Sequence, residues 1–216
     1  FPDSKEVIET RFLVALAAGQ WEVANAKMDV AIAKNMDNAN GLTFRARLQA
    51  ARGQVTEAIA SAEEAIRRVP ANTEMYRLLG KLLAMRGRMT EAVEAFRQAV
   101  EARPTDPVAT REFVLALLEV NRFQDALEQC RKNPKVANSD EELASLWLDL
   151  EWQGGDRAKA LEGRTKIHKT QPEMRSNTLA LARMHVEEGR HAEAQPLIAE
   201  MKAQSDGLDV ASIEAT

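Results

Sequence analysis

Residues 73–106 read TEMYRLLGKLLAMRGRMTEAVEAFRQAVEARPTD, and this stretch holds two helical patterns on either side of Gly87. Before the glycine, apolar residues recur at helical spacing at Tyr76, Leu79 and Leu83. After it, the same spacing relates Met89, Ala92, Val93, Phe96, Ala99 and Val100. Residues three and four positions apart share one face of a helix, and Pro104 cannot continue the second helix. The stretch therefore predicts a helix, a short turn and a second helix.

The landmarks of this stretch return every 34 residues along the chain. The residues at the turn position of successive units are Gly19, Gly53, Gly87, Asn121, Gly155 and Gly189. Five residues after each turn residue comes an alanine, at Ala24, Ala58, Ala92, Ala126, Ala160 and Ala194. We expect the turn residues to adopt the left-handed conformation that ends many helices. We expect the alanines to be the short side chains that let two paired helices approach closely. One unbroken period of this kind indicates stacked helix-pair repeats.

The period divides the chain into units. Their predicted boundaries are 5–38, 39–72, 73–106, 107–140, 141–174 and 175–208, and residues 209–216 read as the start of a seventh. A proline or an Asn/Asp-rich stretch closes most units, at residues 36–40, 70–72, 104–106 and at Pro172. We expect one continuous repeat domain, which is a piece of a longer protein because no polar capping helix ends it.

The fourth unit departs from the pattern. Asn133 and Pro134 fall where its second helix should continue, so we expect that helix to end near Lys132. The following residues, 132–141, then form an irregular link. Ser139 offers a cap for the first helix of the fifth unit, with acidic residues in the first turn.

The repeat resembles the tetratricopeptide repeat. The characteristic positions of that family are held here by Tyr76, Leu79, Gly80, Leu83, Gly87, Ala92, Phe96, Ala99 and Pro104. The resemblance covers residues 5–208 and implies an all-α, right-handed solenoid of about six antiparallel helix pairs. It also implies a concave surface lined by the first helix of each unit. Packing between successive pairs is expected of Trp21, Tyr76, Phe96, Phe113, Phe123 and Trp147.

Composition and motifs argue against several functions. The net charge of −4 over 216 residues is unlike that of a general nucleic-acid binder, and no apolar run is long enough to span a bilayer. Cys130 is the only cysteine, so we expect a buried apolar role for it and no intrachain disulfide. The three histidines lack metal-ligand spacing, and no nucleophile motif or phosphate loop is present. We expect no enzyme activity, metal or cofactor, and we leave open a cytoplasmic or a periplasmic location.

Candidate binding residues follow from helix geometry. Places two, five, nine and twelve of each first helix lie on one stripe facing away from the second helix. At the amino end this stripe carries Glu6, Glu9, Leu13 and Leu16, and its later part also includes Leu179 and Val186. The candidate partner-binding residues are Arg47, Arg77, Lys81, Arg111, Leu115, Leu118, Asp149, Trp152 and Arg183. We call the residues at these four places of the first helices the first-helix stripe.

Two interpretations of the basic residues in the first-helix stripe stay open. Their guanidinium groups suit a carboxylate or an acidic peptide segment. Alternatively they are solvated and neutralised by Glu74, Glu112 or other neighbours. Trp152 is likewise either a binding anchor on the surface or a residue that fills a gap.

The sequence thus predicts a protein–protein interaction scaffold that binds a peptide or protein partner in its concave groove. The alternative is a recognition or regulatory arm of a larger enzyme or of a secretion or envelope assembly protein. RNA binding by related helical repeats is disfavoured by the acidic balance. The chaperone-tail clamp of some tetratricopeptide repeat proteins is not matched, because Glu9, Leu13, Thr43 and Arg47 do not reproduce its lysine and asparagine pattern.

Overall fold

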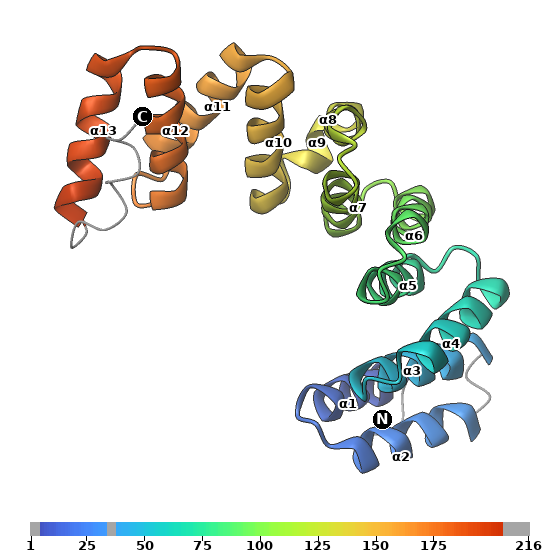
Figure 1. Ribbon diagram of the computed structural model, residues 1–216. Helices are drawn as coiled ribbons and strands as arrows, with labels where there is room; N and C mark the ends of the chain where they lie inside the picture. The colour runs from blue at the N-terminus through green and yellow to red at the C-terminus, as the bar shows by residue number, and fades with distance from the viewer. Residues whose placement is uncertain (1–4, 34–37, 205–216) are drawn as a thin grey trace. The chain divides into compact units, whose positions relative to one another are not determined.

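The computed structural model describes residues 5–33 and 38–204, and these are helical apart from turns and short links (Figure 1). The chain divides into two compact units between Arg122 and Phe123. The first unit contains α1 (Lys5–Ala17), α2 (Trp21–Ala33), α3 (Asn38–Ala51), α4 (Val55–Arg68), α5 (Thr73–Met85), α6 (Met89–Ala102) and α7 (Pro107–Glu119). The second contains α8 (Phe123–Lys132), α9 (Pro134–Ala137), α10 (Glu141–Gly154), α11 (Arg157–Thr170), α12 (Arg175–Glu187) and α13 (His191–Gln204).

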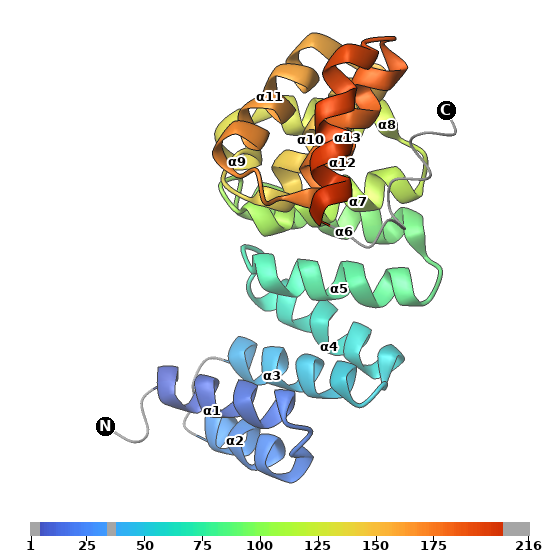
Figure 2. The ribbon, with the colours of Figure 1, turned by 90° about the vertical axis from the view of Figure 1, so that its left-hand side faces the viewer.

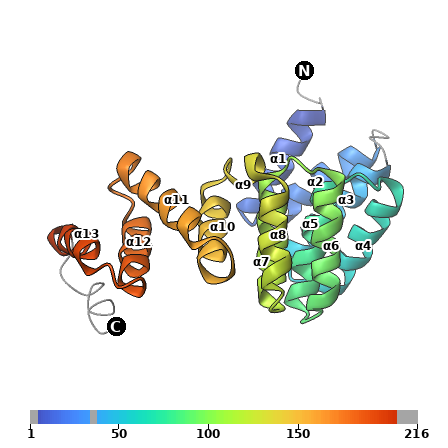
Figure 3. The same cartoon turned by 90° about the horizontal axis from the view of Figure 1, so that it is seen from above.

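Consecutive helices pack as antiparallel pairs, namely α1 with α2, α3 with α4 and α5 with α6 in the first unit, and α10 with α11 and α12 with α13 in the second. Figures 2 and 3 show α5 beside α6 in the first unit, and Figure 1 shows α12 beside α13 in the second. In the first unit, α1, α3, α5 and α7 also contact one another in succession, so the first helices of the repeats form a row. The all-α fold predicted from the sequence is confirmed, and the single continuous domain stays a prediction.

Five of the six turn residues have the predicted left-handed conformation. The φ angles are 67° at Gly19, 74° at Gly53, 73° at Gly87, 71° at Gly189 and 60° at Asn121. Gly155 is the exception, with φ of −128°, so the prediction is wrong there. Its glycine serves another purpose, because a Cβ atom would overlap Oε2 of Glu151 and lie 2.7 Å from Nη2 of Arg131.

The six repeated alanines are buried, none being more than 1% exposed, which confirms the prediction of burial. The aromatic residues are more varied. Phe96, Phe113 and Trp147 are buried and Trp21 and Tyr76 are half-buried, whereas Phe123 is 46% exposed. The prediction that Phe123 fills a space between pairs is therefore wrong, because it begins the helix after the turn and half of its surface meets solvent.

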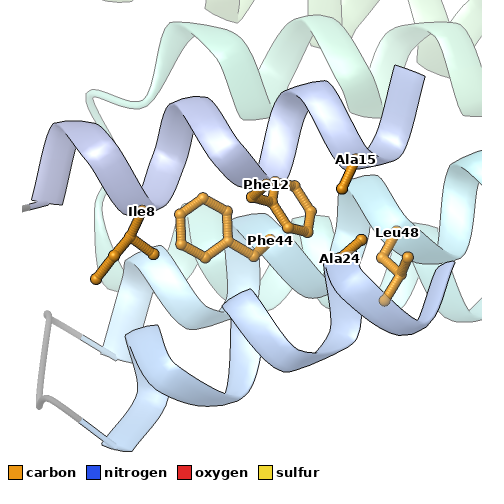
Figure 4. Packing of buried hydrophobic residues seen from close by; sticks show 6 residues of the cluster. All are labelled: Ile8, Phe12, Ala15, Ala24, Phe44 and Leu48. Atoms are coloured by element: carbon orange, nitrogen blue, oxygen red, sulfur yellow. The ribbon is translucent and has the colours of Figure 1, made fainter. Parts of the chain in front are cut away.

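Close approach within a pair is clearest at Gly80 on α5. A Cβ atom there would lie 2.8 Å from the ring of Phe96 on α6, so only glycine leaves room for this ring. At the start of the chain, aromatic packing joins the first two repeats (Figure 4). The rings of Phe12 on α1 and Phe44 on α3 lie 4.6 Å apart between centroids, and Ile8, Ala15, Ala24 and Leu48 surround them.

The link in the fourth repeat is more regular than predicted. The helix α8 ends at Lys132 as expected, but Pro134 then starts the one-turn helix α9. Proline fits this first helical position because its φ is preset and its missing N–H is not needed there. Asp140, and not Ser139, caps α10: its side chain accepts a hydrogen bond from the backbone N–H of Leu143 at 2.8 Å. The hydroxyl of Ser139 instead donates to the carbonyl of Val136.

Candidate partner-binding surface

The structure places the first-helix stripe on helices of both compact units. Arg47 lies on α3, Arg77 and Lys81 on α5, and Arg111, Leu115 and Leu118 on α7. These six belong to the first unit. Asp149 and Trp152 lie on α10 and Arg183 on α12, in the second unit.

The basic residues of α5 already have a carboxylate partner. Arg77 donates two hydrogen bonds to Glu112 on α7, from Nε at 2.6 Å and from Nη2 at 2.9 Å. Nζ of Lys81 lies 2.8 Å from the same carboxylate. Burial opposes ionisation of Glu112, but these hydrogen bonds outweigh it and lower its pKa. Glu112 therefore stays charged and neutralises part of the stripe.

Arg47 is the most buried cation of the stripe, with 10% of its side chain exposed. One nitrogen, Nη2, pairs with Glu74 on α5, and the other, Nη1, lies 3.9 Å from Oε1 of Glu9 on α1. Nη1 has no hydrogen-bond partner among the residues that the structure describes. Burial lowers the pKa of Arg47, while the charge of Glu9 opposes the change. Arg47 thus ties three successive first helices together.

Apolar side chains on the same stripe are partly open to solvent. Leu115 is 46% exposed, Leu118 is half-buried, and Leu13 on α1 is 40% exposed. Arg111 is half-buried on α7. The first unit thus presents scattered leucines beside cations that have acidic neighbours.

In the second unit, Asp149, Trp152 and Arg183 line one groove of about 620 Å³. The remaining lining residues are Leu146, Gln153, Arg157, Ser176, Leu179, Ala180, Met184 and Glu187. Leu179 belongs to the stripe as predicted. The sequence interpretation missed Ser176, although it occupies place two of its repeat. It also missed Arg157, because that residue starts the second helix of a repeat.

Trp152 is only 7% exposed although it lines the groove, so its position fits the gap-filling interpretation and leaves little of the ring open to a ligand. Its indole Nε1 donates to Oε2 of Glu187 on α12 at 2.6 Å. The guanidinium of Arg157 stacks over its ring at 4.7 Å from the centroid. These contacts fix the ring as part of the groove wall.

Asp149 accepts a hydrogen bond from a buried arginine. Nη2 of Arg164 on α11 donates to Oδ1 of Asp149 at 2.6 Å and to the carbonyl of Ser145 at 3.0 Å. Nη1 of Arg164 donates to the buried Asn177 on α12 at 3.3 Å. Arg164 therefore joins three helices beneath the groove and compensates the charge of Asp149.

Arg183 differs from the other charged residues of the groove. It is exposed, and the structure gives it no hydrogen bond or ion pair with any residue in 5–33 or 38–204. Arg157, by contrast, pairs with Glu188 at 3.0 Å. Arg183 is thus a cation on the groove wall with open hydrogen-bonding capacity.

Metal and thiol chemistry find little support in the described part of the chain. No group of three or more His, Cys, Asp or Glu side chains there could hold a metal ion. Cys130 is buried as predicted, and burial together with the nearby charge of Glu151 raises the pKa of its thiol to about 12. The thiol therefore stays protonated at neutral pH. None of the described helices has the length and hydropathy that a bilayer span requires.

Comparison with known proteins finds a family match for the first half of the described chain. Residues 10–72 and 45–107 each match the model described as Tetratricopeptide repeat. Residues 10–107 of the chain thus match tetratricopeptide repeats, and the fold is an all-α helical-repeat solenoid. No curated protein sequence matches the chain.

Solved structures share the fold at low sequence identity. The tetratricopeptide repeat protein YrrB, described as having an unusual peptide-binding site, is 15% identical with a TM-score of 0.72, over 88% of this chain and 98% of YrrB. Pseudomonas aeruginosa pilF is 16% identical with a TM-score of 0.72, over 97% of this chain and 96% of pilF. MamA from Desulfovibrio magneticus RS-1 is 23% identical with a TM-score of 0.63, over 79% of this chain and 98% of the MamA chain.

Proposed function

We propose that this chain binds a peptide or protein segment along the surface formed by the first helices of its repeats. The observation that carries the proposal is the convergence of Asp149, Trp152 and Arg183 on one groove. All three occupy equivalent helical positions, at place nine or twelve of a first helix. A groove of about 620 Å³ lies within the size range of ligand sites in proteins, roughly 300–1,000 Å³. It is large enough for a few side chains of an extended peptide.

The groove suits a peptide better than a small polar metabolite. Its lining includes the apolar residues Leu146, Leu179 and Ala180 together with charged residues on both helices. Apolar pockets with a polar rim are typical of surfaces that anchor one or two side chains of a partner. The described peptide-binding site of YrrB is consistent with this proposal, because the two chains share the fold.

The stripe residues of the first unit are a second candidate surface. Leu115 and Leu118 offer apolar contacts, and Arg47, Arg77, Lys81 and Arg111 offer positive charge to an acidic segment. A ligand carboxylate at Arg77 or Lys81 has to share these groups with Glu112. We therefore expect the basic part of the stripe to modulate affinity rather than to anchor the ligand.

The alternative role, as the recognition arm of a larger enzyme or of a secretion or envelope assembly protein, uses the same surface. Both versions place peptide recognition in this chain and any chemistry outside it. The same binding experiment therefore tests the surface in either case.

Selection from a random displayed peptide library on the immobilised chain tests the proposal. We expect enriched peptides to bind the folded chain and to lose affinity when Arg77 and Arg111 are both changed to glutamate. Because Arg77 also holds Glu112, circular dichroism has to show unchanged helicity in that variant. The double reversal Arg77→Glu with Glu112→Arg is the matched control, since it restores an ion pair at this position. Failure to enrich any peptide that prefers the folded over the unfolded chain would refute the proposed function.

A further inference from the structure

Resting on this proposed function, we infer that the groove between α10 and α12 binds a peptide segment in which an Asp or Glu side chain lies next to an apolar one. Arg183 is the residue that contacts the carboxylate. The groove is built from α10, α11 and α12, which follow one another in the orange part of the chain (Figure 1).

The acidic residues of the groove are already engaged by donors from the chain itself. Asp149 accepts from the buried Arg164 at 2.6 Å, and Glu187 accepts from Nε1 of Trp152 at 2.6 Å. A cationic ligand would have to compete with Arg164, which is almost fully buried and cannot turn to solvent. The carboxylates of the groove therefore serve its structure, and they are poor candidates for recognising a basic partner.

The cations of the groove are unequal. Arg157 stacks on Trp152 and pairs with Glu188, whereas Arg183 has no polar partner in the described part of the chain. A guanidinium has five N–H donors and no acceptor. The group that Arg183 lacks is an acceptor with two oxygens, and a carboxylate binds a guanidinium through two parallel hydrogen bonds.

The surroundings of Arg183 explain why an apolar side chain should accompany the carboxylate. Leu179 lies one turn before Arg183 on α12, and Leu146 faces the same groove from α10. Behind the groove, Trp152 and Met184 are both buried and pack with Ala160 in one apolar cluster. A leucine or phenylalanine of the ligand would cover these apolar atoms while its acidic neighbour reaches Arg183.

The first unit shows why the acid contact falls to Arg183. Arg47, Arg77 and Lys81 each lie beside Glu74 or Glu112. A ligand carboxylate binds less favourably where it must displace a carboxylate of the chain itself. Of these four cations of the stripe, Arg183 therefore offers a ligand carboxylate the most favourable binding free energy.

A double-mutant cycle between chain and ligand tests the inference. The probes are fluorescein-labelled peptides taken from the library selection, each paired with a copy in which Asp or Glu is replaced by Asn or Gln. We expect the selected peptides to be enriched in an acidic residue beside an apolar one. Arg183→Ala should weaken the acidic peptide by roughly tenfold or more in fluorescence anisotropy, and should weaken the amide copy much less. Lys166→Ala, which removes an exposed charge from α11 of the same unit, is the control and should change affinity less than about twofold.

The three tryptophans report where the peptide binds. In ¹⁵N-labelled protein, each tryptophan indole N–H gives an NMR signal. Trp152 lies at the groove, whereas Trp21 belongs to the first unit. We expect the peptide to shift the Trp152 signal and to leave that of Trp21 in place. Peptides that bind but show no preference for acidic residues, no dependence on Arg183 or no effect on Trp152 would overturn the inference and leave the proposed function standing. If the library yields no peptide for the folded chain, both fail.

Discussion

Arg77 on α5 and Glu112 on α7 form a two-pronged ion pair between residues 35 positions apart, with hydrogen bonds of 2.6 and 2.9 Å. Trp152 on α10 and Glu187 on α12 are joined across the same interval by a hydrogen bond of 2.6 Å. Each contact links the first helix of one repeat to the first helix of the next. The interval exceeds the 34-residue period by one residue. Polar contacts at this separation thus join neighbouring repeats in both units, beside contacts at other separations such as Arg47–Glu74.

The Arg77–Glu112 pair should stabilise the first unit. Its two side chains are only 23% and 14% exposed, so removing one partner leaves a poorly solvated charge. We expect Arg77→Glu to lower the free energy of unfolding by roughly 1–2 kcal/mol, less than for a fully buried pair. Glu112→Arg should act in the same direction, and the double reversal should recover part of the loss. Urea unfolding followed by circular dichroism measures this coupling, and strictly additive losses would contradict it.

Glu151 should make the second unit sensitive to acid. It is fully buried, and hydrogen bonds from Arg131 above all, together with those from Asp156 N–H, Trp147 and Lys159, lower its pKa from 4.5 to about 2 despite burial. Because the pKa is lower in the folded chain, the stabilisation is complete above about pH 4.5 and is lost as the pH falls toward 2. Its full size is on the order of 3 kcal/mol.

Glu151→Gln checks this pH dependence. The variant should be less stable than the native chain at pH 7, and the difference between the two should shrink between pH 4.5 and pH 2. Glu162→Gln, which changes an exposed carboxylate on α11, is the control and should show little difference at any pH. A Glu151→Gln deficit that is equal at pH 7 and pH 2.5 would show that the ion cluster does not act through the charge of Glu151.

Substitution by asparagine should cost different amounts of stability at two glycines in equivalent turn positions. Gly87 has a φ of 73° and open space around its Cα, and the equivalent residue of the fourth repeat is Asn121 with a φ of 60°. Gly87→Asn should therefore cost little. Gly155→Asn should destabilise the second unit by roughly 1–3 kcal/mol, because its Cβ would intrude between Glu151 and Arg131. Thermal unfolding of the two variants compares the costs, and equal costs would mean that the Glu151 cluster yields without strain.

The sequence predicted what depends on local spacing. Helix ends, the left-handed turn at Gly87 and the burial of Ala92 follow from one repeat taken by itself, because they reflect backbone geometry and contacts within a pair. Gly155 shows the limit of that reasoning. Its place in the repeat is the same as that of Gly87, but the reason for glycine there is a side-chain cluster contributed by α8, α10 and α11.

The candidate site was predicted to a similar extent. Helical geometry selected Asp149, Trp152 and Arg183, which share a groove, but it could not show which of them has a partner. The burial of Trp152 depends on Glu187, one repeat away, and on Arg157, on a different helix. Such contacts require the spacing between helices, and a single sequence does not contain that information.

The repeated alanines provide the most direct test of how the helix pairs pack. Ala92 on α6 and Ala126 on α8 are both 0% exposed; α6 packs against α5, and α8 packs against α10. Leucine at either place adds three carbon atoms where no space exists, so Ala92→Leu or Ala126→Leu should each cost roughly 1–3 kcal/mol. Ala60→Leu, at an exposed position of α4, is the matched control and should be close to neutral because leucine and alanine are both good helix formers. Melting temperatures from circular dichroism should separate the buried variants from the control. An unchanged melting temperature in both buried variants would mean that these alanines do not set the distance between paired helices.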